Sequence, residues 1–359
     1  MTRPSRRAPR GALVLLTTLA LVGAACGEDD DAGSDVMPET AASSPTSAAA
    51  VTVTSPSPTA SDPATGVAGA AIDNCGVDVP VDAAPTRAVT MNQAATEVVL
   101  SLGLADRLIG TAYLDDEILP ELAAAYATVP VVAAEYPSTE ALLDTDPDFV
   151  YASYRSAFEA DAAGPRGELA DLGIGSYLSP AACPDRPAGE PLTFDVVFEE
   201  FAEVAEVFGV PEAGAELVAE QQAILDASVV EGGEDITVLW WDDGFDVPSA
   251  GACCGAPGMI MAAAGVENVA ADVAGSWADI SWEQVVAADP DVIVLIDASW
   301  STAADKQAHL ESDPALAGLT AVQQRRFVTI PFSSTTPGVR NASALGELAA
   351  GVEAFGPIG

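Results

Sequence analysis

The chain has 359 residues and carries 54 acidic side chains against 13 lysines and arginines, which gives a formal net charge of −41. Lys306 and His309 are its single lysine and single histidine. Lys306 is preceded by aspartate and followed by glutamine, so the chain has no Gly-Lys-Ser/Thr phosphate loop, and one histidine cannot build a multi-histidine zinc site within one chain. Nucleic-acid binding needs a basic face that this composition does not supply. We expect no metal site, no resident cofactor and no nucleic-acid partner.

Residues 1–26 are typical of an export signal. Four arginines precede an apolar run, residues 11–25, that is too short and wrongly flanked for a transmembrane helix. The run ends in Val-Gly-Ala-Ala-Cys, and small residues before a cysteine resemble the bacterial lipobox. This pattern predicts lipidation of Cys26 and an extracytoplasmic protein anchored to the cell membrane through lipid alone. The alternative is ordinary secretory cleavage beside an incidental cysteine.

Residues 27–73 are rich in Asp, Ser, Thr, Pro, Ala and Gly and contain no aromatic residue. Such a segment cannot bury enough apolar surface to offset the entropy of ordering it. We predict a disordered tether over residues 27–73, with the folded part beginning near Asn74.

The folded part contains one phrase twice. Residues 138–150 and 281–293 share a serine, a glutamate, an Asp-Pro-Asp and their apolar positions. Each copy is expected to be a short helix that is capped by serine, stops before proline and leads into a buried strand. Coincidence among helix–strand junctions is the alternative. Two matched halves predict two α/β lobes, at residues 74–192 and 231–359.

Residues 193–230 join these halves, and their apolar residues recur at helical spacing with an interruption at Gly209-Val210-Pro211. We predict one long, kinked linking helix that resists hinging. The predicted fold class is therefore α/β, with two Rossmann-like lobes that have parallel-rich sheets and are joined by a long, kinked connecting helix.

The lipobox, the tether, the two lobes and the linking helix together resemble the substrate-binding lipoproteins of ABC importers that bind ferric siderophores, haem or cobalamin. Residues 87–91, residues 96–103 and the two glutamate-containing phrases carry the resemblance. It implies a monomeric receptor, not an enzyme, that delivers a small chelate ligand to ABC permease and ATPase subunits. In that family one glutamate on each lobe docks onto permease arginines, and these glutamates match Glu140 and Glu283. The alternative explanation is that each glutamate is simply an acidic residue that the helix dipole favours in the first turn of a helix.

A narrower resemblance is to an actinobacterial branch, through Tyr154 to Phe158, residues 181–183 and residues 191–195. Some members of that branch are assigned to import of a deazaflavin-coenzyme precursor, which makes such a precursor the alternative to an iron-siderophore or cobalamin-like ligand. The sequence departs from the branch at Cys253-Cys254.

A ligand is expected in the cleft beyond the carboxyl ends of the strands, where aromatic rings and two arginines gather. Tyr113 and Trp277 are weaker candidates. The alternatives are that some of these aromatic residues belong to the core and that Arg340 is a structural salt-bridge partner. The predicted ligand-binding residues are Asn92, Gln93, Tyr136, Tyr154, Arg155, Trp241, Asp242, Cys253, Cys254, Trp300 and Arg340.

Four cysteines remain after lipidation, and outside the cytoplasm disulfides are expected. We favour a Cys75–Cys183 bond that closes a large loop in the first lobe. Cys253 and Cys254 are adjacent, and we hypothesise a vicinal disulfide among glycines that forms an apolar patch in the cleft. A thiol metal site is the alternative there.

Two other functional classes compete with a receptor. A secreted hydrolase with paired carboxylates could use Asp242 and Asp243, although no Gly-x-Ser-x-Gly nucleophile motif is present. A surface adhesion or scaffold protein would bind no small ligand.

Overall fold

The structure is a computed structural model, and it describes residues 70–358. The predicted signal peptide, Cys26 and nearly all of the tether lie outside the described residues. Strand β1 (Ala71–Asn74) pairs with β2 (Val77–Pro80) in an antiparallel hairpin, so ordered structure begins before the predicted start at Asn74. Among residues 70–358, no helix has the length and apolar character needed to cross a membrane.

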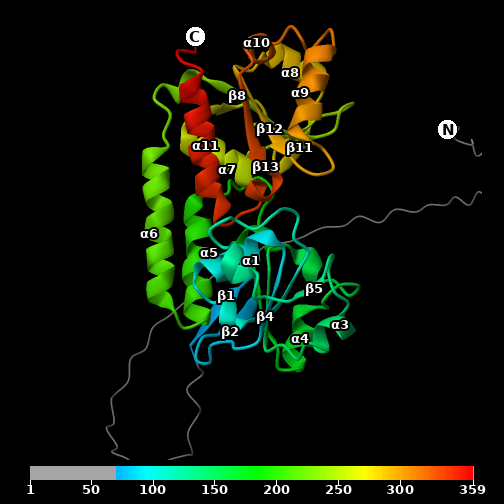
Figure 1. The fold of residues 1–359 in the computed structure, drawn as a ribbon, viewed down its shortest axis with the longest axis vertical. Helices are drawn as coiled ribbons and strands as arrows, with labels where there is room; N and C mark the ends of the chain where they lie inside the picture. Colours follow the sequence, from blue (N-terminus) through cyan, green and yellow to red (C-terminus); the bar gives the residue numbers. More distant parts are fainter. Residues whose placement is uncertain (1–69, 359) are drawn as a thin grey trace, which may run out of the picture. The chain divides into compact units, whose positions relative to one another are not determined.

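The first lobe is built on a five-stranded sheet with the order β5-β4-β3-β6-β7, in which every pairing is parallel. Its strands are β3 (Ala88–Met91), β4 (Leu108–Ala112), β5 (Val131–Ala133), β6 (Phe149–Ala152) and β7 (Gly175–Leu178). Its α-helices are α1 (Gln93–Ser101), α2 (Ala123–Tyr126), α3 (Thr139–Leu143) and α4 (Arg166–Asp171) (Figure 1). Strands β3 and β6 are wholly buried, as expected for a parallel sheet covered on both faces.

The second lobe has a mixed sheet with the order β11-β9-β8-β12-β13, and β10 pairs with β8. Its parallel part joins β8, β10, β12 and β13, while β9 and β11 run antiparallel. The strands are β8 (Thr237–Asp243), β9 (Ser249–Gly251), β10 (Glu267–Asn268), β11 (Trp277–Asp279), β12 (Val292–Asp297) and β13 (Phe327–Pro331). The α-helices are α7 (Ala256–Ala264), α8 (Trp282–Ala288), α9 (Ala303–Ser312), α10 (Thr320–Gln323) and α11 (Arg340–Ala354). The predicted α/β class with parallel-rich sheets is confirmed.

The duplicated phrase forms the same structure in both lobes. Ser138 and Ser281 cap α3 and α8 by accepting a hydrogen bond from the backbone three residues on. The second aspartate of each Asp-Pro-Asp then holds the start of the neighbouring parallel strand. Asp148 accepts hydrogen bonds from the backbone and hydroxyl of Thr86, and Asp291 accepts the same pair from Thr237. The repeat therefore fixes the register of the two central strand pairs, β3–β6 and β8–β12.

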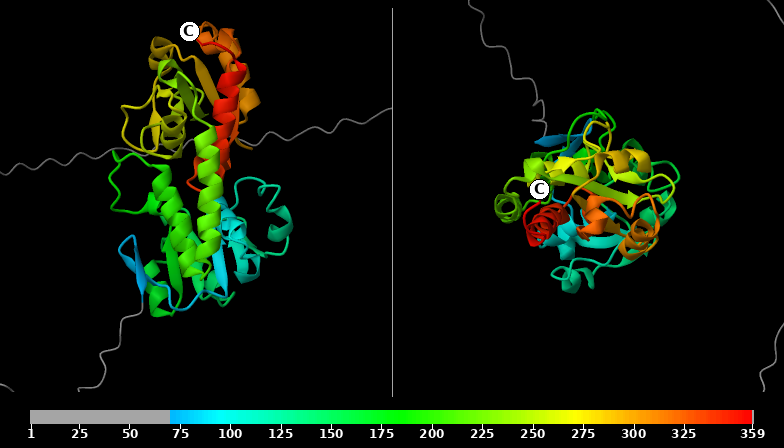
Figure 2. Two further views of the ribbon diagram at one scale, coloured as in Figure 1. Left: turned by 90° about the vertical axis from the view of Figure 1, so that its left-hand side faces the viewer. Right: turned by 90° about the horizontal axis from the view of Figure 1, so that it is seen from above.

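The connection between the lobes differs from the prediction. Residues 193–230 form two helices, α5 (Phe194–Val207) and α6 (Pro211–Ala227), which pack against each other instead of forming one kinked rod. Gly209 has a φ of 71° and turns the chain, and Pro211 starts α6 because its missing N–H is not needed there. Gly214 lets the two helices approach closely, since an added Cβ would lie 2.5 Å from the Cβ of Ala205. Figures 1 and 2 draw α6 beside both α5 and α11.

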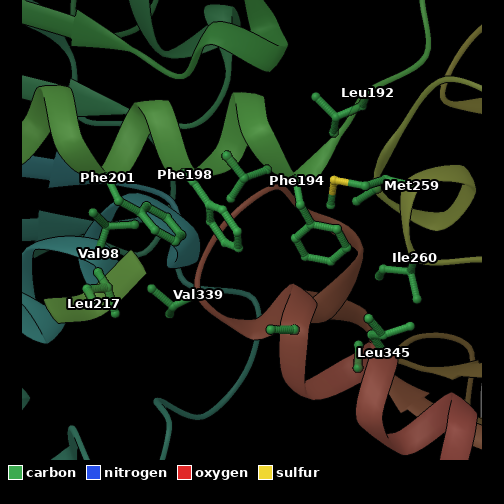
Figure 3. Packing of buried hydrophobic residues seen from close by; sticks show 14 of the residues in the cluster. Val98, Leu192, Phe194, Phe198, Phe201, Leu217, Met259, Ile260, Val339 and Leu345 are labelled. Carbon is green, nitrogen blue, oxygen red and sulfur yellow. The ribbon is translucent and has the colours of Figure 1, made fainter. Parts of the chain in front are cut away.

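One hydrophobic cluster includes buried side chains of both lobes and of α5. Figure 3 shows Phe194, Phe198 and Phe201 in a row along α5. Phe201 lies near Val98 of the first lobe, while Phe194 lies toward Met259 of the second lobe. Full burial of one such side chain stabilises a protein by roughly 1.5–3 kcal/mol, so α5 anchors both lobes to a common core.

Candidate ligand-binding site

A large cavity of about 660 Å³ opens where the two lobes face each other. The first lobe contributes the segment after β6 and the loop after β7, and the second contributes the start of α7, β11 and the loop after β13. Its wall is made by Ser153, Tyr154, Arg155, Ser156, Glu159, Ala181, Ala182, Cys183, Arg186, Pro187, Ala188, Leu192, Cys254, Gly255, Ala256, Gly275, Ser276, Trp277, Phe332, Thr335 and Pro337. These segments follow or flank strand ends, as the sequence predicted for a cleft between two α/β lobes.

A second cavity of about 550 Å³ adjoins the first, and we call it the acidic cavity. It shares Tyr154, Ser156, Glu159 and Phe332 with the large cavity. Its other lining residues are Asn92, Tyr113, Asp115, Glu135, Tyr136, Asp161 and Ala162. The carboxylates of Asp115, Glu135, Glu159 and Asp161 give this part of the cleft a negative potential.

Tyrosine rings organise the acidic cavity. Tyr113 and Tyr136 meet edge to face with ring centroids 4.6 Å apart. The Tyr136 hydroxyl lies 3.0 Å from the Asn92 amide nitrogen and 3.1 Å from the Ser156 hydroxyl. The Tyr154 hydroxyl is 2.5 Å from that of Thr336, a contact between the lobes. Burial raises the pKa of Tyr154 to about 12, so its phenol stays protonated at neutral pH.

Arg155 stands apart from the other cations. Within residues 70–358, it is the one lysine or arginine whose side chain has neither an ion pair nor a hydrogen bond, and it lies exposed on the wall of the large cavity. Arg186 also lines the cavity but is paired with Glu190 at 3.2 Å. The Arg155 guanidinium therefore has all its donors available to an anionic or oxygen-rich group.

The structure contains two disulfides, Cys75–Cys183 and Cys253–Cys254. Cys183 from the first lobe and Cys254 from the second both line the large cavity, while Cys253 does not. Within the described residues no cluster of histidine, cysteine and acidic side chains is arranged to hold a metal. Of the two residues of the Cys253–Cys254 bond, Cys254 alone belongs to the cavity wall.

Trp241 and Asp242 do not line either cavity. The sequence suggested that they lie just beyond a strand, but β8 continues to Asp243, so Trp241 lies within it. Trp240 and Trp241 point to opposite faces of the sheet, and both are fully buried because each face is covered. The Trp241 ring packs edge to face against Trp282. Burial raises the pKa of Asp242 to about 6, with Lys306 acting in the opposite direction.

Arg340 and Gln93 belong to a buried polar network between the lobes. The Arg340 guanidinium forms a bidentate ion pair with Glu97 of α1, at 2.7 and 2.5 Å. It also donates to the backbone oxygen of Glu117 at 2.6 Å. Gln93 donates to Glu97 at 3.0 Å. Both nitrogens of the Arg340 fork thus pair with Glu97, which agrees with the alternative of a structural salt-bridge partner and not with a free anion-binding group.

Trp300 lines neither cavity but contacts Phe332, which lines both. Trp300 is 57% exposed and packs edge to face on Phe332 with centroids 4.8 Å apart. Tyr113 and Trp277, the weaker candidates, both line a cavity. Phe332 lines both cavities and was missed, because it follows β13 in a segment without any recognised motif. The strand-end rule alone could have indicated it.

Glu140 and Glu283 occupy matched positions in the first turns of α3 and α8, and both are exposed. Figure 1 draws α3 and α8 on the side away from α6. Neither glutamate lines a cavity, so their carboxylates are available to a partner.

Comparisons with known proteins add to this geometry. Residues 89–333 match a family described as Periplasmic binding protein. A periplasmic binding protein from Veillonella parvula is 29% identical, with a TM-score of 0.69, and the match covers 77% of this chain and 94% of that one. A protein of an ABC-type Fe3+-hydroxamate transport system from Saccharomonospora viridis is 25% identical, with a TM-score of 0.64 over 80% and 99% of the chains.

The periplasmic haem-binding protein RhuT from Roseiflexus shares the fold, at 24% identity and a TM-score of 0.57 over 76% of this chain and 98% of that one. No curated protein matches.

Proposed function

Because this chain belongs to the periplasmic binding protein family, we propose that it is a lipid-anchored receptor that binds a ferric hydroxamate-type siderophore and delivers it to an ABC permease. Members of the family are solute-binding transport receptors that work outside the cytoplasm, and this chain is one of them. The choice of ligand rests on one observation. The cleft combines aromatic walls with a single unpaired cation, Arg155, against four carboxylates.

The charge of the cleft separates the siderophore classes. A ferric complex of three hydroxamates is neutral because the three anionic groups balance the metal, whereas three catecholates leave several negative charges. Asp115, Glu135, Glu159 and Asp161 would repel such a polyanion in a partly desolvated cavity. A neutral chelate avoids this cost, and its oxygen-rich face can accept hydrogen bonds from Arg155.

The aromatic rings serve the remainder of the ligand. Tyr154, Trp277 and Phe332 line the large cavity, and Trp300 extends this surface to the solvent. Rings of this kind bury the apolar linkers of a chelate at little entropic cost. The volume of about 660 Å³ is within the range of pockets that enclose small molecules. The hydroxamate system of the Saccharomonospora relative agrees with this ligand class.

Haem, cobalamin and a deazaflavin precursor are the competing ligands. Haem iron needs an axial side chain, and His309 lies among Trp241, Phe245 and Trp282 and lines neither cavity. The tyrosines with the closest hydroxyl contacts are already engaged, since the Tyr154 hydroxyl pairs with Thr336 and the Tyr136 hydroxyl pairs with Asn92 and Ser156. The cleft therefore favours a ligand that arrives with its metal already fully chelated. Neither Asp242 nor Asp243 lines either cavity, which disfavours the hydrolase alternative.

The experiment is a titration of the full lipidated chain in detergent, followed by tryptophan fluorescence. The probes are ferrioxamine B, a ferric tricatecholate, haemin, cyanocobalamin and a deazaflavin. We expect the trihydroxamate to bind at least tenfold more tightly than the tricatecholate. Arg155→Gln should weaken binding about tenfold through loss of a charged hydrogen bond. Arg325→Gln, which removes an exposed ion pair with Glu311 elsewhere, is the control and should bind normally.

Preference for haemin, cobalamin or the deazaflavin would replace the proposed ligand while leaving the receptor role intact. Failure of every probe to bind, together with turnover of an ester, peptide or glycoside, would contradict the receptor role itself. A chain that binds no small molecule and catalyses nothing would fit an adhesion or scaffold protein.

We propose further that Glu140 and Glu283 pair with basic groups of the permease and that lipid at Cys26 holds the chain at the membrane. Glu140→Arg with Glu283→Arg should abolish uptake and leave ligand affinity unchanged, because both glutamates lie away from the cleft. Cys26→Ala should release the chain into the medium. Unchanged uptake by the double variant would contradict the docking role.

A further inference from the structure

The duplicated phrase places a second kind of side chain beside each docking glutamate. Leu143 lies three residues after Glu140, and Val286 lies three residues after Glu283. Residues three apart on a helix share a face. Leu143 is 37% exposed and Val286 is 41% exposed, whereas the residues just before them, Leu142 and Val285, are fully buried.

This pattern is not needed for the stability of either lobe. A short surface helix needs one apolar residue per turn to face the core, and Leu142 and Val285 already fill that position. A second apolar side chain at the next position meets solvent, and it does so at the same place in both copies. The lobes have otherwise diverged in sheet topology, since one sheet is parallel and the other mixed.

In the second lobe the apolar surface is larger. Trp282, which precedes Glu283, donates from its ring nitrogen to the backbone oxygen of Phe245 at 2.7 Å. Phe245 and Val247 are 38% and 53% exposed. This hydrogen bond joins the first turn of α8, which carries Glu283, to a loop with two exposed apolar side chains.

We propose that Leu143 and Val286 are apolar anchors of the permease interface, each inserting next to the ion pair made by the neighbouring glutamate. The inference rests on the proposed receptor function. The occupant is a permease with two equivalent subunits, because the chain presents two matched carboxylate–apolar pairs. Each subunit would offer a cation beside an apolar surface. Burying the apolar side chain excludes water from the ion pair and strengthens it.

The test uses photo-crosslinking in cells and needs no knowledge of the ligand. Benzoylphenylalanine is introduced in place of Leu143 or Val286 in the full chain. The controls are the same replacement at Leu172 and Val229, which are 59% and 60% exposed but lie outside the duplicated phrase. A fifth position, Gln284 beside Glu283, reports docking through the glutamate alone. Adducts are identified by mass spectrometry.

We expect permease adducts from positions 143 and 286 at a yield at least tenfold above that from 172 and 229. In addition, Leu143→Ser with Val286→Ser should reduce the crosslink from position 284 about tenfold, whereas Leu172→Ser with Val229→Ser should leave it unchanged. Because all four side chains are exposed, these variants are expected to fold.

Equal yields from all four positions would overturn the inference, and so would a position 284 crosslink that is insensitive to the Leu143 and Val286 substitutions. In both cases the receptor function would stand. No permease adduct from any position, including 284, would instead contradict docking on a permease and with it the proposed function.

Discussion

The buried ion pair between Glu97 and Arg340 allows a quantitative test of how the lobes are joined. Glu97 is fully buried and the Arg340 side chain is 10% exposed, so removal of either partner leaves an uncompensated charge. Such a change costs about 3–5 kcal/mol. We therefore expect Glu97→Met and Arg340→Met each to lower the free energy of unfolding by about 3–5 kcal/mol.

The double variant should be far from additive. With both charges gone, the remaining cost comes from three polar groups. The backbone N–H of Leu119 and the Gln93 amide lose Glu97 as acceptor, and the Glu117 carbonyl loses Arg340 as donor. An unsatisfied buried group costs about 1–3 kcal/mol. The double variant should therefore be about as stable as either single variant.

The assay is urea unfolding followed by tryptophan fluorescence, with the four proteins of the cycle compared at equal m-values. The control is Arg325→Met, which removes an exposed ion pair with Glu311 and should cost less than about 1 kcal/mol. Single variants that behave like this control, or a double variant that shows the full sum of both losses, would refute the reasoning.

Three further predictions concern stability. Burial raises the pKa of Glu200 from 4.5 to about 7, so the native carboxyl keeps a proton that the unfolded chain loses. The free energy of unfolding should therefore fall as the pH rises from about 4.5 to about 7. Glu200→Gln should remove this pH dependence and be about 3 kcal/mol more stable than the wild type at pH 8. Equal pH dependence of the two proteins in urea unfolding would contradict this. Gly214→Ala should destabilise the protein by about 1–3 kcal/mol, because the added methyl group overpacks the contact between α5 and α6. Gly167→Ala is the control and should have no such effect, because no atom lies within 4 Å of the added group. The two variants are compared by thermal unfolding. Loss of the Cys75–Cys183 bond by a double serine substitution should cost about 2–5 kcal/mol, because it closes a loop with a sequence separation of 108; an unchanged melting temperature would argue against it.

The sequence predicted the parts of the fold that depend on local patterns. The serine caps, the buried strands β6 and β12 and the duplication itself follow from residue type and spacing, and the structure has them. The linking segment was predicted wrongly because Gly209 and Pro211 are compatible with both a kink and a reversal. Packing decides between the two, and the contact of Gly214 with α5 is invisible to periodicity.

The sequence predicted which strand ends border the site, but it did not predict which side chains there face the cavities. Tyr154 and Arg155 follow a strand that ends where it was expected to end. Trp241 was misplaced because β8 runs on to Asp243. Arg340 looked like a free cation because its partner, Glu97, is distant in sequence and belongs to the other lobe.

The row of phenylalanines along α5 has a consequence for how the protein folds. Phe194, Phe198 and Phe201 belong to a hydrophobic cluster that includes side chains of both lobes. Each lobe also has a cluster of its own, but the face of each lobe that packs on α5 loses part of its cover without the other lobe. Two α/β halves of this size would ordinarily melt as separate cooperative units. Here their unfolding is coupled, so calorimetry should record one transition, and a chain cut between the lobes should yield two insoluble fragments instead of two domains.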